Sequence, residues 1–137
     1  MRPLLLIPAL AILAGCVNPP LPPVDPQQAW VDMFTITGNL VMADKLDGKS
    51  WPDGRFFQFQ PGSHELQIRY DYVTNGSGFI GFDNVTMRTC YIVVPYDHFA
   101  PGQHYRLEAR NAGVTISGRL YDAQHNMVAE DREVNCI

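Results

Sequence analysis

Apolar and polar residues alternate along much of the chain beyond residue 29. The period of two is clearest in three segments, with apolar side chains at Leu66, Ile68, Tyr70 and Tyr72, at Tyr105, Leu107 and Ala109, and at Val114, Ile116 and Leu120. Successive side chains of a strand point to opposite faces, so each segment would have one buried face and one solvent-exposed face. The alternation therefore predicts half-buried β-strands.

Weaker signals extend the same pattern. They are apolar residues of one parity at Phe34, Ile36, Leu40 and Met42, and a short strand at Phe57 and Phe59. Residues 86–94 are apolar on both parities around Cys90, which is typical of an interior strand. No window shows a convincing helical stripe, so we expect an all-β protein.

Turn residues fall between these segments. The strongest turn signals are Asp47-Gly48, Asp53-Gly54, Pro61-Gly62, Asn75-Gly76 and Pro101-Gly102. About seven or eight short strands between such turns predict a single small antiparallel β-sandwich, with a small β-barrel as the alternative. We favour the sandwich because a bond between Cys90 and Cys136 could join its two sheets.

The N-terminus is different in character. Arg2 precedes an apolar run, Leu4 to Leu13, that is too short for a bilayer core, which needs about 20 apolar residues. A basic start, an apolar centre and small residues before Cys16 are the layout of a secretory signal. Leu13-Ala14-Gly15-Cys16 resembles the lipobox of bacterial lipoproteins. An ordinary signal peptide that happens to end near a cysteine is the alternative.

The lipobox resemblance implies cleavage before Cys16 and acylation of its thiol and new amine, because the family is processed in this way. Two or three acyl chains make a stable anchor where one would be marginal. Val17 stands where an aspartate would hold such a lipoprotein at the inner membrane, so the resemblance implies an outer-membrane location. It leaves open which leaflet carries the protein.

Five prolines follow within residues 17–28. Proline restrains itself and its predecessor to extended conformations, so we expect a spacer that reaches about 37 Å. A ligand for a proline-recognition domain is the alternative. The chain thus divides into a signal peptide at 1–15, a lipidated cysteine and Pro-rich tether at 16–28, and a β-sandwich domain at 29–137.

Two thiols remain after Cys16, and export to an oxidising compartment predicts a disulfide between Cys90 and Cys136. Two free thiols on a metal are the alternative, but 46 positions separate them and neither belongs to a CxxC pair.

Without Arg2, nine basic and fourteen acidic residues leave the mature chain with a net charge of −5. This charge argues against a nucleic-acid partner and against a basic lipid-docking patch.

Candidate chemistry is sparse. The histidines lie in no HExxH pair, and only His98 and His104 are close enough in sequence to be considered, as weak metal ligands. No serine has a nucleophile-elbow context and the carboxylates cluster in turns. We therefore expect no enzymatic activity and no cofactor.

Apolar residues in two loops are candidates for partner binding. Trp51 lies between Gly48 and Gly54, and Phe79 and Phe82 follow Asn75-Gly76. Aromatic side chains on loops are frequent binding hot spots. The alternative is that Trp51 caps the sandwich and that Phe79 to Phe82 is another strand.

Pro61-Gly62-Ser63-His64 and Pro101-Gly102-Gln103-His104 each precede an alternating strand, a pattern similar to small immunoglobulin-like or PEGA-like envelope domains. The combination of a membrane address, a spacer and a compact β domain without a catalytic constellation favours a non-enzymatic binding or accessory module for an envelope protein or cell-wall partner. A small-molecule or metal-binding carrier lipoprotein is the alternative, with its ligand between the sheets or at the His98 and His104 turn.

Overall fold

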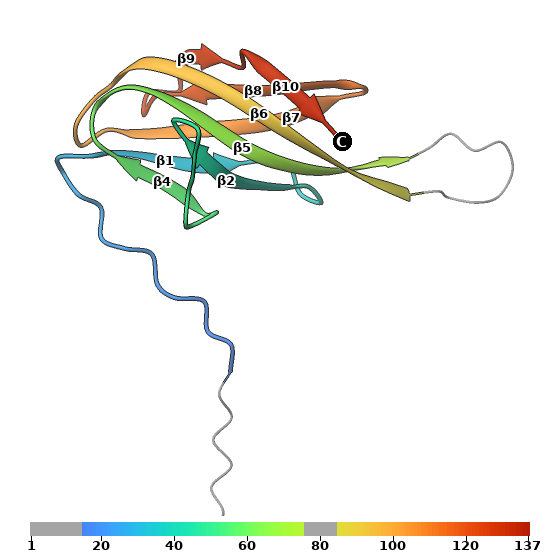
Figure 1. Cartoon of the computed structure of the whole chain (residues 1–137), viewed down its shortest axis with the longest axis horizontal. Helices are drawn as coiled ribbons and strands as arrows, with labels where there is room; N and C mark the ends of the chain where they lie inside the picture. Colours follow the sequence, from blue (N-terminus) through green and yellow to red (C-terminus); the bar gives the residue numbers. More distant parts are fainter. Residues whose placement is uncertain (1–14, 76–84) are drawn as a thin grey trace, which may run out of the picture.

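The computed structural model describes residues 15–75 and 85–137, and within these ranges the chain forms ten β-strands and no helix (Figure 1). The strands are β1 (Ala29–Phe34), β2 (Leu40–Leu46), β3 (Lys49–Ser50), β4 (Phe56–Phe59), β5 (Gly62–Asn75), β6 (Val85–Phe99), β7 (His104–Ala112), β8 (Thr115–Tyr121), β9 (Met127–Glu130) and β10 (Glu133–Cys136). No helix of the described part could cross a membrane.

The strands form two five-stranded sheets, ordered β4-β1-β7-β8-β9 (sheet A) and β10-β6-β5-β2-β3 (sheet B). All pairs are antiparallel except β1 with β7. Each sheet keeps two edge strands, so the β-sandwich prediction is confirmed and the barrel alternative is wrong. The strand count exceeds the expected one because edge strands such as β3, of two residues, are too short to show a period.

Two of the three clearest alternating segments are confirmed as half-buried strands. In β5, Leu66, Ile68, Tyr70 and Tyr72 all point into the core, as do Tyr105, Leu107 and Ala109 of β7. Ile92 and Val94 of β6 are the cross-strand partners of Ile68 and Leu66 in β5, and they also point into the core. The buried rows of sheets A and B together make up one core.

Near the turns the sequence pattern was misleading. Phe34, Ile36 and Leu40 are exposed, because β1 ends at Phe34 and its inward residues include Val31 instead. Val114 is almost fully exposed because β8 begins one residue later, at Thr115. Apolar residues at alternate positions therefore did not identify core residues where a turn interrupted the strand.

The two sheets approach closely at Gly118 of β8. A Cβ atom at this position would lie 2.6 Å from Cγ2 of Ile92 and 3.2 Å from Cγ2 of Val94. Only a residue without a side chain fits between β8 and β6 at this point. Gly118 therefore sets the spacing of the sheets where it faces sheet B.

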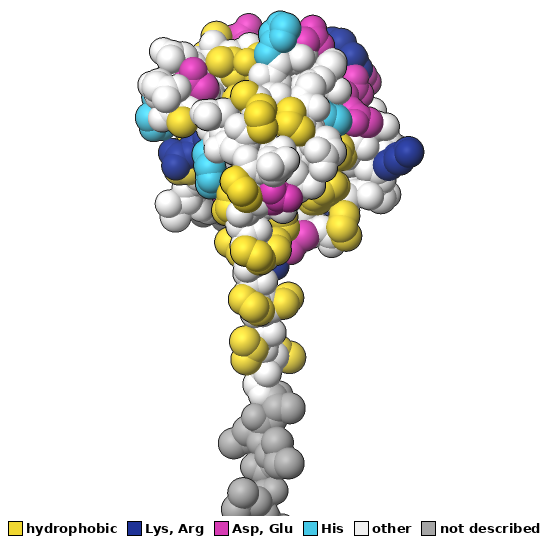
Figure 2. Space-filling view, turned by 90° about the vertical axis from the view of Figure 1, so that its left-hand side faces the viewer, with side chains coloured by type: hydrophobic (Ala, Val, Ile, Leu, Met, Phe, Trp, Pro, Cys, Tyr) yellow, Lys and Arg dark blue, Asp and Glu magenta, His cyan; other side chains and the backbone are white. Residues whose placement is uncertain are grey.

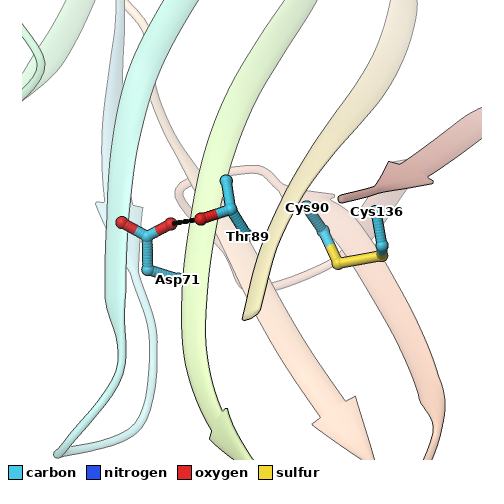
Figure 3. The surroundings of a disulfide bond; sticks show 4 residues. All are labelled: Asp71, Thr89, Cys90 and Cys136. Carbon is cyan, nitrogen blue, oxygen red and sulfur yellow. Dashed lines mark hydrogen bonds between the residues drawn. A yellow bond between two sulfur atoms is a disulfide. The ribbon is translucent and has the colours of Figure 1, made fainter. Parts of the chain in front are cut away.

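The disulfide between Cys90 and Cys136 is present, with a Cα–Cα distance of 4.0 Å (Figure 3). Its position differs from our expectation, because it does not join the two sheets. The two cysteines are direct cross-strand partners in the antiparallel pair of β6 and β10, both in sheet B. The last strand returns to the edge beside β6, so the bond attaches the C-terminus to its own sheet.

The tether meets the domain at the β6–β7 turn. Gly102 has a φ of +70°, and a Cβ there would lie 2.8 Å from the Pro26 carbonyl oxygen. The Gly102 amide donates to the Gln28 carbonyl over 2.9 Å. Residues 16–25 form neither helix nor strand, and Figure 2 shows them as a narrow stalk beneath the domain. We call this end of the sandwich the proximal end.

Replacing Gly118 with alanine should destabilise the domain by about 1 to 3 kcal/mol, because the new methyl group must displace the side chain of Ile92 or Val94. Urea unfolding followed by tryptophan fluorescence measures the loss. Ser117→Ala, one position away on the outer face, is the matched control and should change stability by less than about 0.5 kcal/mol. Equal effects of the two variants would contradict the proposed close contact.

Removing the disulfide with a Cys90→Ala, Cys136→Ala double variant should lower the free energy of unfolding by about 4 kcal/mol, the chain-entropy value for its 46-residue separation. The wild-type chain unfolded in the presence of a reductant should lose a similar amount. A double variant as stable as the oxidised wild type would show that pairing of β10 with β6 is sufficient without the bond.

Candidate functional site

Exposed apolar side chains gather at the end of the sandwich opposite the tether. Among the described residues of the domain, nine large apolar side chains are exposed, and seven of them lie at this end. We call it the distal end and define it by Ile36, Leu40, Val73, Val85, Met87, Val114 and Ile137. Surface apolar residues scattered singly are ordinary, whereas a contiguous group marks an interaction site or an aggregation hazard.

Strand pairing explains why several of these residues share one surface. Val73 pairs directly with Met87 on the outer face of sheet B, and Leu40 lies on the same face opposite Asp71. The backbone amide of Ile137 donates to the Thr89 carbonyl over 2.9 Å, which brings the C-terminal residue beside β6. Met87 is 70% exposed and Ile137 78% exposed.

The β5–β6 hairpin also projects beyond the rest of the sandwich at this end (Figure 1). The two strands remain paired as far as Asn75 and Val85. Because no third strand flanks this part of the ribbon in the register of sheet B, its side chains have few neighbours to cover them. The exposure of Val85 and Met87 is thus a consequence of the topology.

A polar cluster bounds the apolar surface on sheet B. Asp71 is buried and accepts a hydrogen bond of 2.6 Å from the Thr89 hydroxyl (Figure 3). It also pairs with the Arg69 guanidinium at 3.0 Å. With its charge neutralised by these contacts, Asp71 can lie next to Leu40 and Val73 without facing water. Asp71, Thr89 and Arg69 therefore separate the apolar residues of the distal end from the polar remainder of the outer face of sheet B.

A second polar network supports the distal end from inside. The buried Tyr70 hydroxyl donates to Oδ1 of Asn111 over 2.7 Å and accepts from Nδ2 of Asn39 over 2.7 Å. Burial raises the pKa of Tyr70, and its hydrogen bonds offset only part of that effect. The network connects the β1–β2 loop, β5 and β7, and so holds three elements of the distal end together.

Trp51, a predicted partner-binding residue, is partly buried at the side of the core. Its indole N–H donates to the Phe56 carbonyl over 2.7 Å, and its ring lies 5.6 Å from that of Phe57. Its amide donates to the Asp44 carbonyl over 2.8 Å. These contacts resemble the capping role that we gave as the alternative, although a pocket beside Pro52 keeps part of the ring accessible.

Phe79 and Phe82, the other two predicted partner-binding residues, lie outside the described residues. The strands that precede and follow them, β5 and β6, lead toward the distal end. Trp51 packs against the core beside Phe56 and Phe57 of β4. The sequence missed the aliphatic residues of the distal end because scattered valines and methionines resemble ordinary strand residues.

The weak metal candidates His98 and His104 have different surroundings. His98 contacts the edge of the Tyr96 ring, with centroids 6.0 Å apart, in a strand of sheet B. His104 lies 6.2 Å from the Trp30 ring in sheet A. The described ranges contain no group of three or more histidine, cysteine, aspartate and glutamate residues suited to a metal ion.

His104 is part of an aromatic row that the sequence analysis missed. Trp30 stacks on Phe56 with 4.4 Å between centroids and planes only 2° apart, and its indole N–H donates to Asp32 over 2.6 Å. Trp30 and Phe56 are both buried although they lie on the outer face of sheet A. Stacked in this way, the rings of Trp30 and Phe56 cover one another and stabilise the outer face of the sheet.

His64 lies between two acceptors at the proximal end. Its Nδ1 is 2.6 Å from an oxygen of Asp47 and its Nε2 is 2.7 Å from the Gln60 carbonyl. Burial by itself would raise the pKa of Asp47, but hydrogen bonds from the Glu65 amide and the His64 ring outweigh it and hold that pKa below its usual range. These contacts join the β2–β3 turn to β5, which is a structural role.

A polar groove of about 450 Å³ crosses the outer face of sheet B, lined by Asp44, Lys45, Glu65, Gln67, Tyr91, Val93, Glu133 and Asn135. Two of its carboxylates already have partners. Asp44 accepts from the Gln67 amide over 2.7 Å, and Glu65 pairs with Arg132 at 2.7 Å. Fewer carboxylates of this groove are therefore free to bind a ligand than its list of residues indicates. For this reason the distal end is the stronger candidate surface.

Replacing Tyr70 with phenylalanine should lower the free energy of unfolding by about 1 to 2 kcal/mol at pH 7, because Asn39 and Asn111 each lose a buried partner. The neutral phenol is favoured in the native state, so the stability it contributes is full below the ordinary pKa of 10.0 and falls as the pH rises through the raised value. Urea titrations at neutral pH and above pH 10 should therefore show a gap between wild type and Tyr70→Phe that narrows with increasing pH. A gap that widens would contradict this assignment.

Comparison with protein-family models, with curated proteins and with solved structures found no significant match to this chain.

Proposed function

We propose that this protein is a lipid-anchored lipoprotein of the bacterial outer membrane that acts as a non-enzymatic binding module. Cys16 would carry the acyl chains, residues 16–28 would serve as the tether, and the β-sandwich would dock on an envelope protein. The observation that carries the proposal is the concentration of exposed aliphatic side chains at the distal end.

The chemistry of the distal end favours a protein over a cell-wall glycan. Its defining residues are all aliphatic or methionine, and such side chains offer no hydrogen-bonding groups to sugar hydroxyls. Burying them against an apolar surface contributes about 25 cal/mol for each Å² removed from water. Methionine adapts its shape to different partners, which suits Met87 at the projecting hairpin.

The placement of the tether supports the same proposal. The tether joins the domain at the proximal end, through Gln28 and Gly102, whereas the apolar residues lie at the opposite end. An anchor and a docking surface at opposite ends allow the domain to face away from its membrane. The tether, with a reach of about 37 Å, would supply the distance.

The carrier alternative gains no support from the interior. The inner faces of the two sheets meet tightly at Gly118, where not even a methyl group fits between β8 and β6. The core residues of β5, β6 and β7 are fully or nearly fully buried against one another. A ligand would therefore have to bind outside the region between the packed sheets.

In-cell crosslinking followed by affinity purification tests the docking proposal. Met87→Asp places a charge on the distal end and should abolish recovery of the crosslinked partner, since a carboxylate is costly to bury in an apolar interface. Met127→Asp is the matched control, because Met127 is exposed at the proximal end and should retain the partner. The two variants should have the same melting temperature.

The same experiment separates anchoring from docking. Cys16→Ala should move the protein from the membrane fraction to the soluble fraction, while the purified chain should still bind a partner recovered from wild-type cells. Equal recovery of the partner by Met87→Asp and Met127→Asp would overturn the distal-end surface. Continued membrane association of Cys16→Ala would overturn the lipid anchor.

A further inference from the structure

A groove opens at the distal end between the projecting hairpin and the β7–β8 turn. It has a volume of about 390 Å³ and is lined by Tyr72, Thr74, Arg88, Gly113, Val114 and Cys136. Small-molecule sites in proteins are typically about 300 to 1,000 Å³ in volume. The groove is therefore large enough for a small ligand, and it is separate from the apolar outer face of sheet B.

Its origin lies in a mismatch of length between the two sheets. Sheet A ends at the turn that contains Gly113 and Val114, whereas β5 and β6 of sheet B continue to Asn75 and Val85. Tyr72 is the last buried residue of the inward-facing row, and its cross-strand partner Arg88 is exposed, with no strand of the described part of sheet A opposite it. The inner face of sheet B thus becomes the wall of a groove.

Among the described residues that line the groove, Arg88 is the one with a charged side chain. Of the seven arginines in the described ranges, five form ion pairs with carboxylates and Arg106 lies over the Phe34 ring, but Arg88 has neither kind of partner within those ranges. The described part of the lining includes no aspartate or glutamate. An anionic group is therefore the complement that the lining lacks.

A hydroxyl group adds a second polar feature. Tyr72 is only 5% exposed, stacks on Tyr70 at 5.4 Å, and makes no side-chain hydrogen bond within the described part of the chain. Since Tyr72 lines the groove, its phenol can donate to a ligand there. Phenol and guanidinium come from directly paired positions, so they can contact the same ligand group.

The rest of the described lining is less polar, and the hydroxyl of Thr74 already donates to the Thr86 carbonyl over 3.2 Å. Val114 is 97% exposed, the highest value among the large apolar residues of the domain, and the disulfide reaches the groove through Cys136. An aliphatic chain lying against Val114 would remove this exposed surface from water. Among its described residues, the groove thus combines one cationic group and the hydroxyls of Tyr72 and Thr74 with the exposed apolar side chain of Val114.

We propose that this groove binds a small amphiphile with an aliphatic chain and a terminal carboxylate, of the fatty-acid class. The carboxylate pairs with Arg88, whose planar guanidinium matches it in a bidentate geometry, and accepts a hydrogen bond from Tyr72. The chain lies along Val114 toward the disulfide. This site goes beyond the proposed docking function, because it requires no protein partner.

Isothermal titration of the complete chain carrying Cys16→Ala with decanoate, below its micelle concentration, tests the proposal. We expect saturable binding at one site, and at least tenfold weaker binding of decanol, which lacks the charge, and of acetate, which lacks the chain. Arg88→Gln should weaken decanoate binding at least tenfold. Arg132→Gln, which removes a charge at the proximal part of sheet B, should leave it unchanged.

Two further variants separate the site from a general affinity for amphiphiles. Val114→Ser should weaken decanoate binding while keeping the fold, since Val114 is exposed in a turn. Met87→Asp, which tests the docking surface, should leave decanoate binding intact, so that either proposal can fail without the other. Absence of saturable binding, equal binding by Arg88→Gln and wild type, or preference for a peptide with an apolar C-terminus over decanoate would each overturn the fatty-acid proposal.

Discussion

The pairing of β5 with β6 is the interaction on which the rest of the structure depends. It runs without a break from His64 opposite Tyr96 to Asn75 opposite Val85, and its inward rows supply the buried residues of sheet B. β2 adds to one side of this hairpin and β10 to the other. Because the hairpin is longer than sheet A, it packs as a core strand pair at one end and projects from the sandwich at the other (Figure 1).

This difference in length gives the two ends of the domain different properties. At the proximal end, short polar contacts such as that of His64 with Asp47 close the turns, and the tether is held by the β6–β7 turn. At the distal end, the ribbon leaves aliphatic residues on its outer face and an arginine on its inner face without a covering sheet. The proposed docking surface and the proposed ligand groove are thus two faces of one projecting hairpin.

The disulfide has a local role that follows from the same topology. It joins the C-terminal edge strand β10 to β6, next to Thr89, whose side chain binds Asp71 (Figure 3). An edge strand held by few pairs is prone to separate from its sheet, and the covalent bond prevents this. The bond also holds Ile137 and Cys136 in place at the distal end, so the shape of both proposed sites depends on it.

The sequence by itself determined the class of fold and the strands of the core, because a period of two in Leu66 to Tyr72 and in Tyr105 to Ala109 reports directly which face of a strand is buried. It also allowed the pairing of Cys90 with Cys136 to be predicted, since only two thiols remained to pair. Which sheet those cysteines occupy, which apolar residues stay exposed, and where Trp51 lies were decided by the tertiary structure. These properties depend on how far strands of unequal length overlap, and local periodicity carries no information about the length of a neighbour that comes later in the chain.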